Sequence, residues 1–237
     1  MIKPLIFADT ETTGIGKVDR LLQLAFRCDG VDVDELYKPP LSINLMAMAV
    51  HHITEKMVTD KPAFNESREC LDLMMRSGKG QILVAHNAKF DLGMLEQEGV
   101  TFEDHICTLR VERHLDPKAE LESYKLQYLR YLYGMELEAE AHDAWGDILV
   151  LEALFWHQVM RIRAMAECDE DTALITMLSV SSVPSIIRRF QFGKHKGEMV
   201  EDVLRYDRSY LEWLKREKQK DEEPDEDWLY TFEQLGV

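Results

Sequence analysis

The sequence predicts an α/β fold in which helices flank a mixed β-sheet, followed by a small, mainly helical C-terminal module. Two observations predict the sheet: three strand-like apolar runs come first, and later strand-like runs alternate with helical ones. A third observation, a shift in charge after residue 184, marks off the module. We therefore expect a domain over residues 1–168, a connector over 169–184, a module over 185–220 and an acidic tail over 221–237.

Apolar runs place the expected strands, and apolar residues at helical spacing place the expected helices. The longest helix should run from about residue 144 to 165, with Ile148, Leu151 and Phe155 on its inner face. We expect a short helix inside the connector and a mobile charge run from Lys220 to Asp227. The other elements are strands near 4–10, 21–28, 33–38, 81–85 and 104–107, helical turns at 45–50 and 54–58, and helices near 66–77, 88–98, 108–115 and 125–133.

The composition is that of a globular protein with an ample core. Hydrophobic residues make up 46% of the chain, and no apolar run approaches the ~20 residues that span a bilayer, so no membrane partner is expected. The N-terminus lacks the basic-then-apolar pattern of a signal peptide. We interpret the cysteines, which form no Cys-x-x-Cys pair, as reduced and buried thiols of a cytoplasmic protein: Cys28, Cys70, Cys107 and Cys168.

Acidic residues follow two of the expected buried strands. Asp9 and Glu11 come at the end of the first strand, two residues apart, so both point to one face if the strand continues through them. Gly14 then ends the strand and lets the backbone approach a ligand closely. Asp91 lies in the first turn of the helix after the strand at 81–85, where the helix dipole favours negative charge.

A third acidic position opens the long helix. Asp147 lies one turn inside it, and His142 lies on the preceding loop, where mobility suits a proton carrier. Each position alone also has a structural interpretation: solvated acids at a strand end, a capping Asp, an ordinary helix-start His. Together, acids gathered at the rim of a core are suited to hold hard divalent cations through oxygen ligands.

The combined pattern resembles the DnaQ-like exonuclease superfamily, whose motifs run Asp-x-Glu, a distant Asp, then His-x-Ala-x-x-Asp. His142, Ala144 and Asp147 match the last motif, and Asp143 stands where a sister branch carries Tyr, which indicates the His (DEDDh) branch. The resemblance implies an RNase H-like fold and 3′→5′ exonuclease activity. It also implies two Mg²⁺ or Mn²⁺ ions held by Asp9, Glu11, Asp91 and Asp147, with His142 as the general base that activates water.

A closer resemblance is to the exonuclease X family. Three stretches carry it: 46–62, 123–129, and 190–197 together with 207–214. It spans roughly residues 4–216, stops at the acidic tail, and implies that DNA 3′ ends, single-stranded or frayed, are degraded to nucleoside 5′-monophosphates, as in DNA repair.

The resemblance also suggests substrate contacts, each of which could instead be structural. It places the backbone of Thr12, Thr13 and Gly14 against the terminal sugar. It places Ile15, Val50 and His51 around the terminal base. Asn87 is the candidate for a polar contact to the substrate or a hydrogen bond that braces the site.

The net charge of −16 is unevenly distributed. Residues 185–220 carry 10 basic and 6 acidic side chains, whereas residues 221–237 carry 7 acidic and no basic ones. Because phosphate contacts need Lys and Arg, the basic segment is the expected nucleic-acid docking site, unless it is simply a solvated surface of mixed charge. The candidate contacts are Arg188, Arg189, Lys194 and Lys196.

Two other functions share these motifs. One is an RNA exonuclease that trims 3′ ends, and the other is a proofreading-type subunit associated with a polymerase. The filled catalytic positions argue against a non-catalytic module, and no sequence feature indicates a polymerase or repair partner. We expect a monomer or homodimer.

Overall fold

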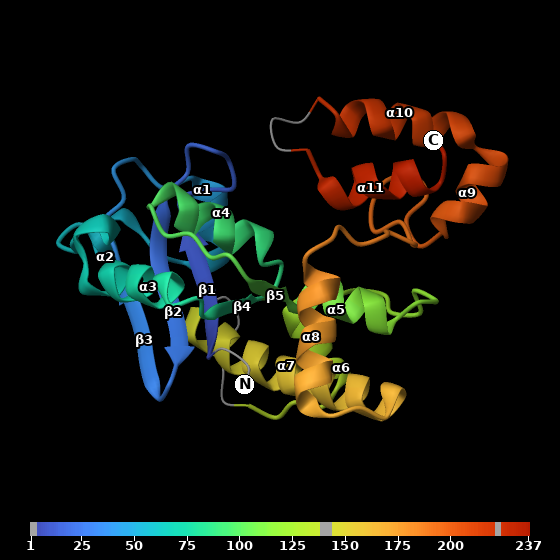
Figure 1. The fold of residues 1–237 in the computed structure, drawn as a ribbon. Coiled ribbons are helices and arrows are strands. Elements are labelled where there is room, and N and C mark those ends of the chain that lie inside the picture. Colours follow the sequence, from blue (N-terminus) through green and yellow to red (C-terminus); the bar gives the residue numbers. More distant parts are fainter. Residues whose placement is uncertain (1–3, 138–143, 221–223) are drawn as a thin grey trace.

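The computed structural model describes residues 4–137, 144–220 and 224–237, and its sheet is mixed, as predicted. The described strands form one five-stranded sheet in the order β3-β2-β1-β4-β5 (Figure 1). The first three strands pair antiparallel, while β4 runs parallel to both β1 and β5. The strands are β1 (Leu5–Thr12), β2 (Leu21–Cys28), β3 (Val31–Leu36), β4 (Ile82–Ala85) and β5 (His105–Cys107).

The helices form where apolar spacing predicts them, and most bounds agree within two residues. Side-chain caps fix several starts; Ser67, for example, accepts a hydrogen bond from the Cys70 amide at the start of α3. The described helices are α1 (Leu45–His51), α2 (Glu55–Val58), η1 (Phe64–Glu66), α3 (Arg68–Gly78), α4 (Lys89–Gln97), α5 (Thr108–Leu115), α6 (Leu126–Leu132), α7 (Ala144–Ala166), α8 (Glu170–Ser181), α9 (Val200–Tyr206), α10 (Arg208–Lys218) and α11 (Glu226–Gln234).

The alternation of side chains along β1 divides the core into two layers. Phe7 points to the layer that contains α7. Its ring packs edge-on against Phe155, with the two ring centroids 5.2 Å apart. Ile6 and Ala8 point to the opposite layer, which contains Leu73 of α3 and Leu95 of α4. The sheet is therefore covered by helices on both faces (Figure 1), in agreement with the predicted flanking helices.

The segment 169–184, expected as a connector with a short helix, is mostly the regular helix α8. Ala173, Leu174 and Met177 are buried in the same cluster as α7. Their spacing buries one face of the helix, so the segment belongs structurally to the large domain.

The segment 221–237, expected as an acidic tail, contains a packed helix. Helix α11 packs beside α10 (Figure 1) and buries Trp228 and Phe232 in a cluster with Phe190 and Leu211. The acidic composition of this segment suggested a tail, although Trp228 and Phe232 are four residues apart, a spacing that places both on one helix face. The C-terminal module is thus helical, as predicted, and has its own apolar core.

The cysteines are free, as expected, although only three are buried. Cys28, Cys70 and Cys107 are inaccessible, whereas Cys168 is partly exposed. None of the described helices has both the length and the apolar character needed to cross a bilayer.

A first prediction concerns the turn before α9. Gly193 has φ +71°, and a Cβ there would lie 2.6 Å from the Tyr210 hydroxyl oxygen. Gly193→Ala should lower the free energy of unfolding by about 1–3 kcal/mol, because it adds a steric clash to left-handed strain. Gly197→Ala is the matched control, since Gly197 has φ +89° with nothing within 4 Å of the added Cβ. Urea unfolding that shows equal losses in both variants would contradict the clash.

Candidate active site

Parallel pairing of β1 with β4 brings the predicted site residues to one edge of the sheet. Phe7 pairs with Val84, so the chain beyond each strand leaves at the same edge. Strand β1 continues through Asp9 and Glu11, which therefore share the face of Phe7, the face that α7 covers. On the neighbouring strand, β4 leads directly into Asn87 and the start of α4.

Asp91 lies in the first turn of α4, as predicted, and is only 3% exposed. The Thr10 hydroxyl donates a 2.8 Å hydrogen bond to its Oδ1. Burial raises the pKa of Asp91 to about 7, and the bond from Thr10 opposes this rise. Thr10 thus ties α4 to β1, a role that its position between Asp9 and Glu11 did not indicate.

Asp147 lies in the first turn of α7, also as predicted. Its Oδ1 accepts a hydrogen bond from Nε2 of Gln127, a residue of α6. Sequence reasoning missed this partner, although Gln127 lies in the 123–129 stretch that carries part of the resemblance. His142, the predicted general base, lies outside the described residues.

The chemistry of the predicted donors fits hard divalent cations, since all four are carboxylates. The buried Asp91 carboxyl, with a pKa of about 7, would be stabilised as an anion by a nearby cation. Within residues 4–137, 144–220 and 224–237, however, no group of three or more His, Cys, Asp or Glu side chains is placed to hold an ion. The donor types therefore fit metal binding, and the number of ions stays a prediction.

The loop predicted to receive the terminal sugar is held by its own hydrogen bonds. Asp19 accepts from the Thr13 hydroxyl at 2.7 Å and from the Gly16 amide at 2.7 Å. A Cβ on Gly14 would lie 2.6 Å from the Asp19 carboxylate, so the close approach at Gly14 is to this side chain. Asp19, which the motif did not point to, pre-organises the loop.

His51 braces the same loop. Its Nδ1 accepts from the Ile53 amide at 2.9 Å, so the proton is on Nε2, which donates to the Thr12 carbonyl at 3.2 Å. Burial lowers the pKa of His51, which favours the neutral ring. Ile15 and Val50, the other predicted base contacts, are exposed to 83% and 49%, so both present apolar surface beside the loop.

Asn87 adopts a left-handed conformation, φ +68°, at the turn between β4 and α4. Asn tolerates left-handed backbone angles better than most residues do. The backbone carbonyl of Asn87 accepts a 2.9 Å hydrogen bond from the Phe90 amide. The preceding His86 is a structural link that sequence reasoning missed. Its Nε2 donates to the Tyr124 carbonyl at 2.8 Å, its Nδ1 lies 2.9 Å from the Thr108 hydroxyl, and burial lowers its pKa to about 4.

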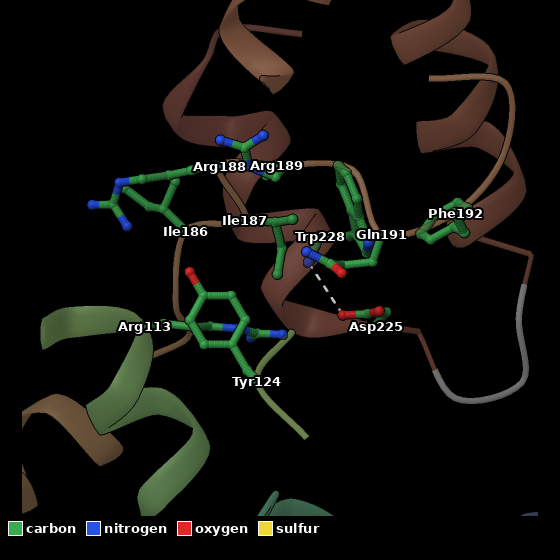
Figure 2. A pocket seen from close by; sticks show the side chains of 10 residues that line it. All are labelled: Arg113, Tyr124, Ile186, Ile187, Arg188, Arg189, Gln191, Phe192, Asp225 and Trp228. Atoms are coloured by element: carbon green, nitrogen blue, oxygen red, sulfur yellow. Dashed lines mark hydrogen bonds between the residues drawn. The ribbon is translucent and has the colours of Figure 1, made fainter. Parts of the chain in front are cut away.

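The basic residues of the C-terminal module differ in their surroundings. Arg189 donates to the backbone carbonyls of Ala119 and Gly197, so it clamps the module to the large domain. Lys194 pairs with Asp207 at 2.6 Å. Arg188 and Trp228 both line a cavity of about 120 Å³ between the two parts (Figure 2), and Lys196 is exposed.

Comparison with known families identifies the large domain. The family model described as Exonuclease matches residues 6–155, and the model described as Exodeoxyribonuclease X-like C-terminal matches residues 190–219. The chain belongs to the exonuclease family. Members of this family generally use divalent metal ions, which agrees with the carboxylate donors.

The similarity to characterised relatives extends over both parts. Exodeoxyribonuclease 10 of Escherichia coli K12 is 32% identical over 212 residues, which is 87% of this chain and 88% of that protein. The structure of exonuclease X in complex with 5′ overhanging duplex DNA is 26% identical, with a TM-score of 0.56, and covers 75% of this chain and 99% of that one. The fold is shared with a zinc-bound complex of exonuclease I of Escherichia coli with single-stranded DNA. That structure is 20% identical, with a TM-score of 0.52, and covers 71% of this chain and 46% of that one.

A second prediction concerns pH and His86. Its folded pKa of about 4 lies below the ordinary value of 6.5, so the unfolded chain takes up the proton first. Its contribution to stability is therefore complete above pH ~6.5 and falls as the pH drops towards ~4. Urea unfolding in EDTA should show this loss, and it should be smaller in His86→Gln. Identical pH profiles for the two proteins would contradict the prediction.

Proposed function

We propose that the protein is a 3′→5′ exodeoxyribonuclease that removes nucleotides from single-stranded or frayed DNA ends and releases nucleoside 5′-monophosphates. The observation that carries this proposal is the edge at which β1 ends: Asp9 and Glu11 face α7, which bears Asp147, and Asp91 is joined to β1 through Thr10. The similarity to exodeoxyribonuclease 10 over both parts of the chain supports DNA as the substrate.

Asp9, Glu11, Asp91 and Asp147 would hold two Mg²⁺ or Mn²⁺ ions, which supply Lewis acidity and a water of lowered pKa. The remaining chemistry belongs to the chain itself. His142 accepts the proton of the attacking water, so the ring must be neutral at the working pH. Its place in the His-x-Ala-x-x-Asp motif, just ahead of α7, supports this role.

The loop at residues 12–15 positions the terminal nucleotide. Because Asp19 and His51 already fix the loop, substrate binding need not order it. The backbone of Thr12, Thr13 and Gly14 meets the sugar, while the exposed Ile15 and Val50 contact the base. His51 acts through the Thr12 carbonyl, and Asn87 contacts the substrate or braces the turn before α4.

An RNA 3′-trimming exonuclease is the second candidate, since the motifs are shared. A proofreading-type subunit is the other candidate, because this chain is 35% identical over 136 residues to DNA polymerase III subunit epsilon of Buchnera aphidicola. That match covers only 48% of this chain and 56% of that protein. The match that includes the C-terminal module favours the exodeoxyribonuclease. The free cysteines are consistent with a cytoplasmic enzyme, and we propose a monomer or homodimer.

The C-terminal module is proposed to hold the nucleic acid strand. Arg188 and Lys196 are the better candidates for phosphate contacts, because Arg189 and Lys194 already bind within the protein. Rates with Mg²⁺ on single-stranded DNA, duplex DNA and RNA of matched sequence test the proposal as a whole. Activity on RNA alone would exclude it.

A third prediction concerns the acids. Asp9→Ala and Asp147→Ala should each abolish hydrolysis, while the fold survives because removing one acid relieves repulsion between carboxylates. The measurements are nucleotide release in Mg²⁺ and thermal melting in EDTA. More than about a tenth of the wild-type rate in either variant would refute the metal-ligand role.

A fourth prediction concerns Gln127 as a positioning residue for Asp147. Removing a hydrogen-bond partner of a metal ligand typically costs about 10–100-fold in metal affinity or activity, and we expect this from Gln127→Leu. The readout is the Mn²⁺ dependence of the rate, since lost positioning raises the Mn²⁺ concentration at half-maximal activity. Gln234→Leu, on an exposed position of α11, is the matched control. An unchanged Mn²⁺ dependence in Gln127→Leu would exclude the role.

A further inference from the structure

A cleft of about 570 Å³ opens beside Asn87 and carries several basic residues on its walls. Lys17, Lys89, Arg110 and Arg113 all line it, although residues 1–184 as a whole are acidic. The volume lies in the range of ~300–1,000 Å³ that is usual for ligand sites. Such a gathering of cations on an acidic domain is suited to bind an anion.

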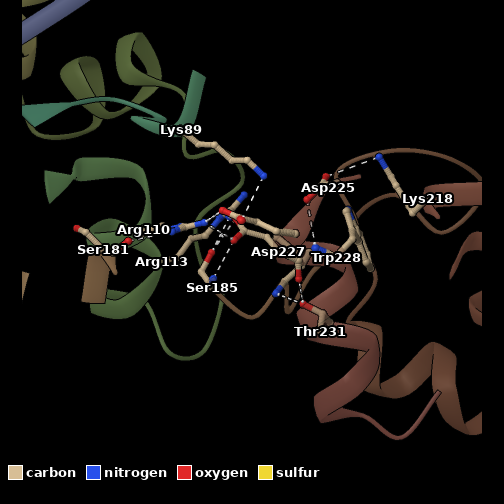
Figure 3. A network of polar contacts seen from close by, with 12 residues as sticks. Lys89, Arg110, Arg113, Ser181, Ser185, Lys218, Asp225, Asp227, Trp228 and Thr231 are labelled. Atoms are coloured by element: carbon tan, nitrogen blue, oxygen red, sulfur yellow. Dashed lines mark hydrogen bonds and ion pairs between the residues drawn. The ribbon is translucent and has the colours of Figure 1, made fainter. Parts of the chain in front are cut away.

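Acidic side chains at the start of α11 pair with three of these cations, Lys89, Arg110 and Arg113 (Figure 3). Glu226 pairs with Arg110 and, at 3.2 Å, with Lys89. Asp227 pairs with Arg113 and lies 3.3 Å from Arg110. Both acids lie beyond residues 190–219, where the C-terminal family model matches.

The two acids are held to different degrees. Asp227 is 15% exposed, and the amide of Ser185 donates a 2.9 Å bond to it, so it anchors the module. Glu226 is 39% exposed, and its side chain forms ion pairs with Lys89 and Arg110. Lys89, at 58%, is exposed, while the Arg110 guanidinium is fixed by its bond to the Ser181 carbonyl. The contacts of Glu226 could therefore be exchanged while Asp227 keeps its bonds to Arg113 and Ser185.

We infer that Arg110 and Lys89 form a binding site for a backbone phosphate of the substrate strand, and that Glu226 occupies this site when no nucleic acid is bound. A phosphate replaces the Glu226 carboxylate as the partner of both cations, while Asp227 keeps the module in place. The inference rests on the proposed function and extends it, because the cleft leads from Asn87 at the catalytic edge towards the module. The acidic end of the chain then limits affinity by competing with the strand.

The first test compares Glu226→Gln with Glu233→Gln, which removes the same charge from an exposed position of α11. Binding of a short 5′-fluorescein-labelled oligothymidylate is measured by anisotropy in EDTA at low salt. Freeing an occupied site should tighten binding about three- to tenfold in Glu226→Gln and leave it near the wild-type value in Glu233→Gln. Adding Lys89→Gln should cancel most of this gain and lower the salt slope by about 0.7. Equal affinities of the two single variants would overturn the inference.

A second test uses the unaltered protein, so its result does not depend on the stability of the Glu226→Gln variant. Lys89 and the exposed Lys79, at the far end of β4, are acetylated with and without saturating oligothymidylate in EDTA. The strand should slow acetylation of Lys89 at least threefold and leave Lys79 unaffected, whereas dTMP at the same phosphate concentration should protect Lys89 less. Unchanged labelling of Lys89 would overturn the inference, and equal protection by dTMP would overturn its assignment to the strand.

These measurements involve no hydrolysis, so their outcome is separate from that of the proposed function. Strand binding at Lys89 without nuclease activity would refute the proposed function alone. Nuclease activity with unchanged Lys89 labelling would refute this inference alone.

Discussion

The pairing of β1 with β4 in parallel is the constraint on which the rest of the site depends. The loops that follow parallel strands leave at the same edge of the sheet, so Asp9 and Glu11 lie at the same edge as the turn at Asn87 although over 70 residues separate them. The two layers of the core hold this pairing, with Phe7 against Phe155 on one side and Ile6 in the cluster with Leu95 on the other. The positions of the acids at this edge therefore depend on packing in both layers.

Burial of acidic side chains at the rim of a core disfavours their charged form, and hydrogen bonds in the structure oppose this effect. Burial raises the pKa of Asp91 to about 7, so a free carboxylate there is disfavoured. Hydrogen bonds from Thr10 to Asp91 and from Gln127 to Asp147 fix two of the four acids in position. Because these carboxylates are already oriented, less free energy is needed to arrange them around cations.

The sequence predicted the elements well because apolar periodicity is a local signal, and β1 and α7 end close to where their patterns end. It could not predict partners chosen by tertiary packing. Gln127 reaches Asp147 from another helix, and α11 packs through Trp228 and Phe232 within a segment whose charge suggested a tail. Asp19 was missed for the same reason, since its role appears only when the loop at Gly14 folds back on it. His142 lies outside the described residues, so its role rests on the motif.

The electrostatics of the chain reconcile an acidic protein with a polyanionic substrate. A net charge of −16 repels nucleic acid at long range, but within a Debye length of ~8–10 Å the local arrangement decides. Cations gather on the cleft beside Asn87 and on the module, while the acids at the catalytic edge are those that cations would neutralise. The acidic start of α11 lies across the cleft between these regions, ion-paired to Arg110 and Arg113. If the strand binds in this cleft, as proposed, the charge of these acids opposes it there and would set affinity.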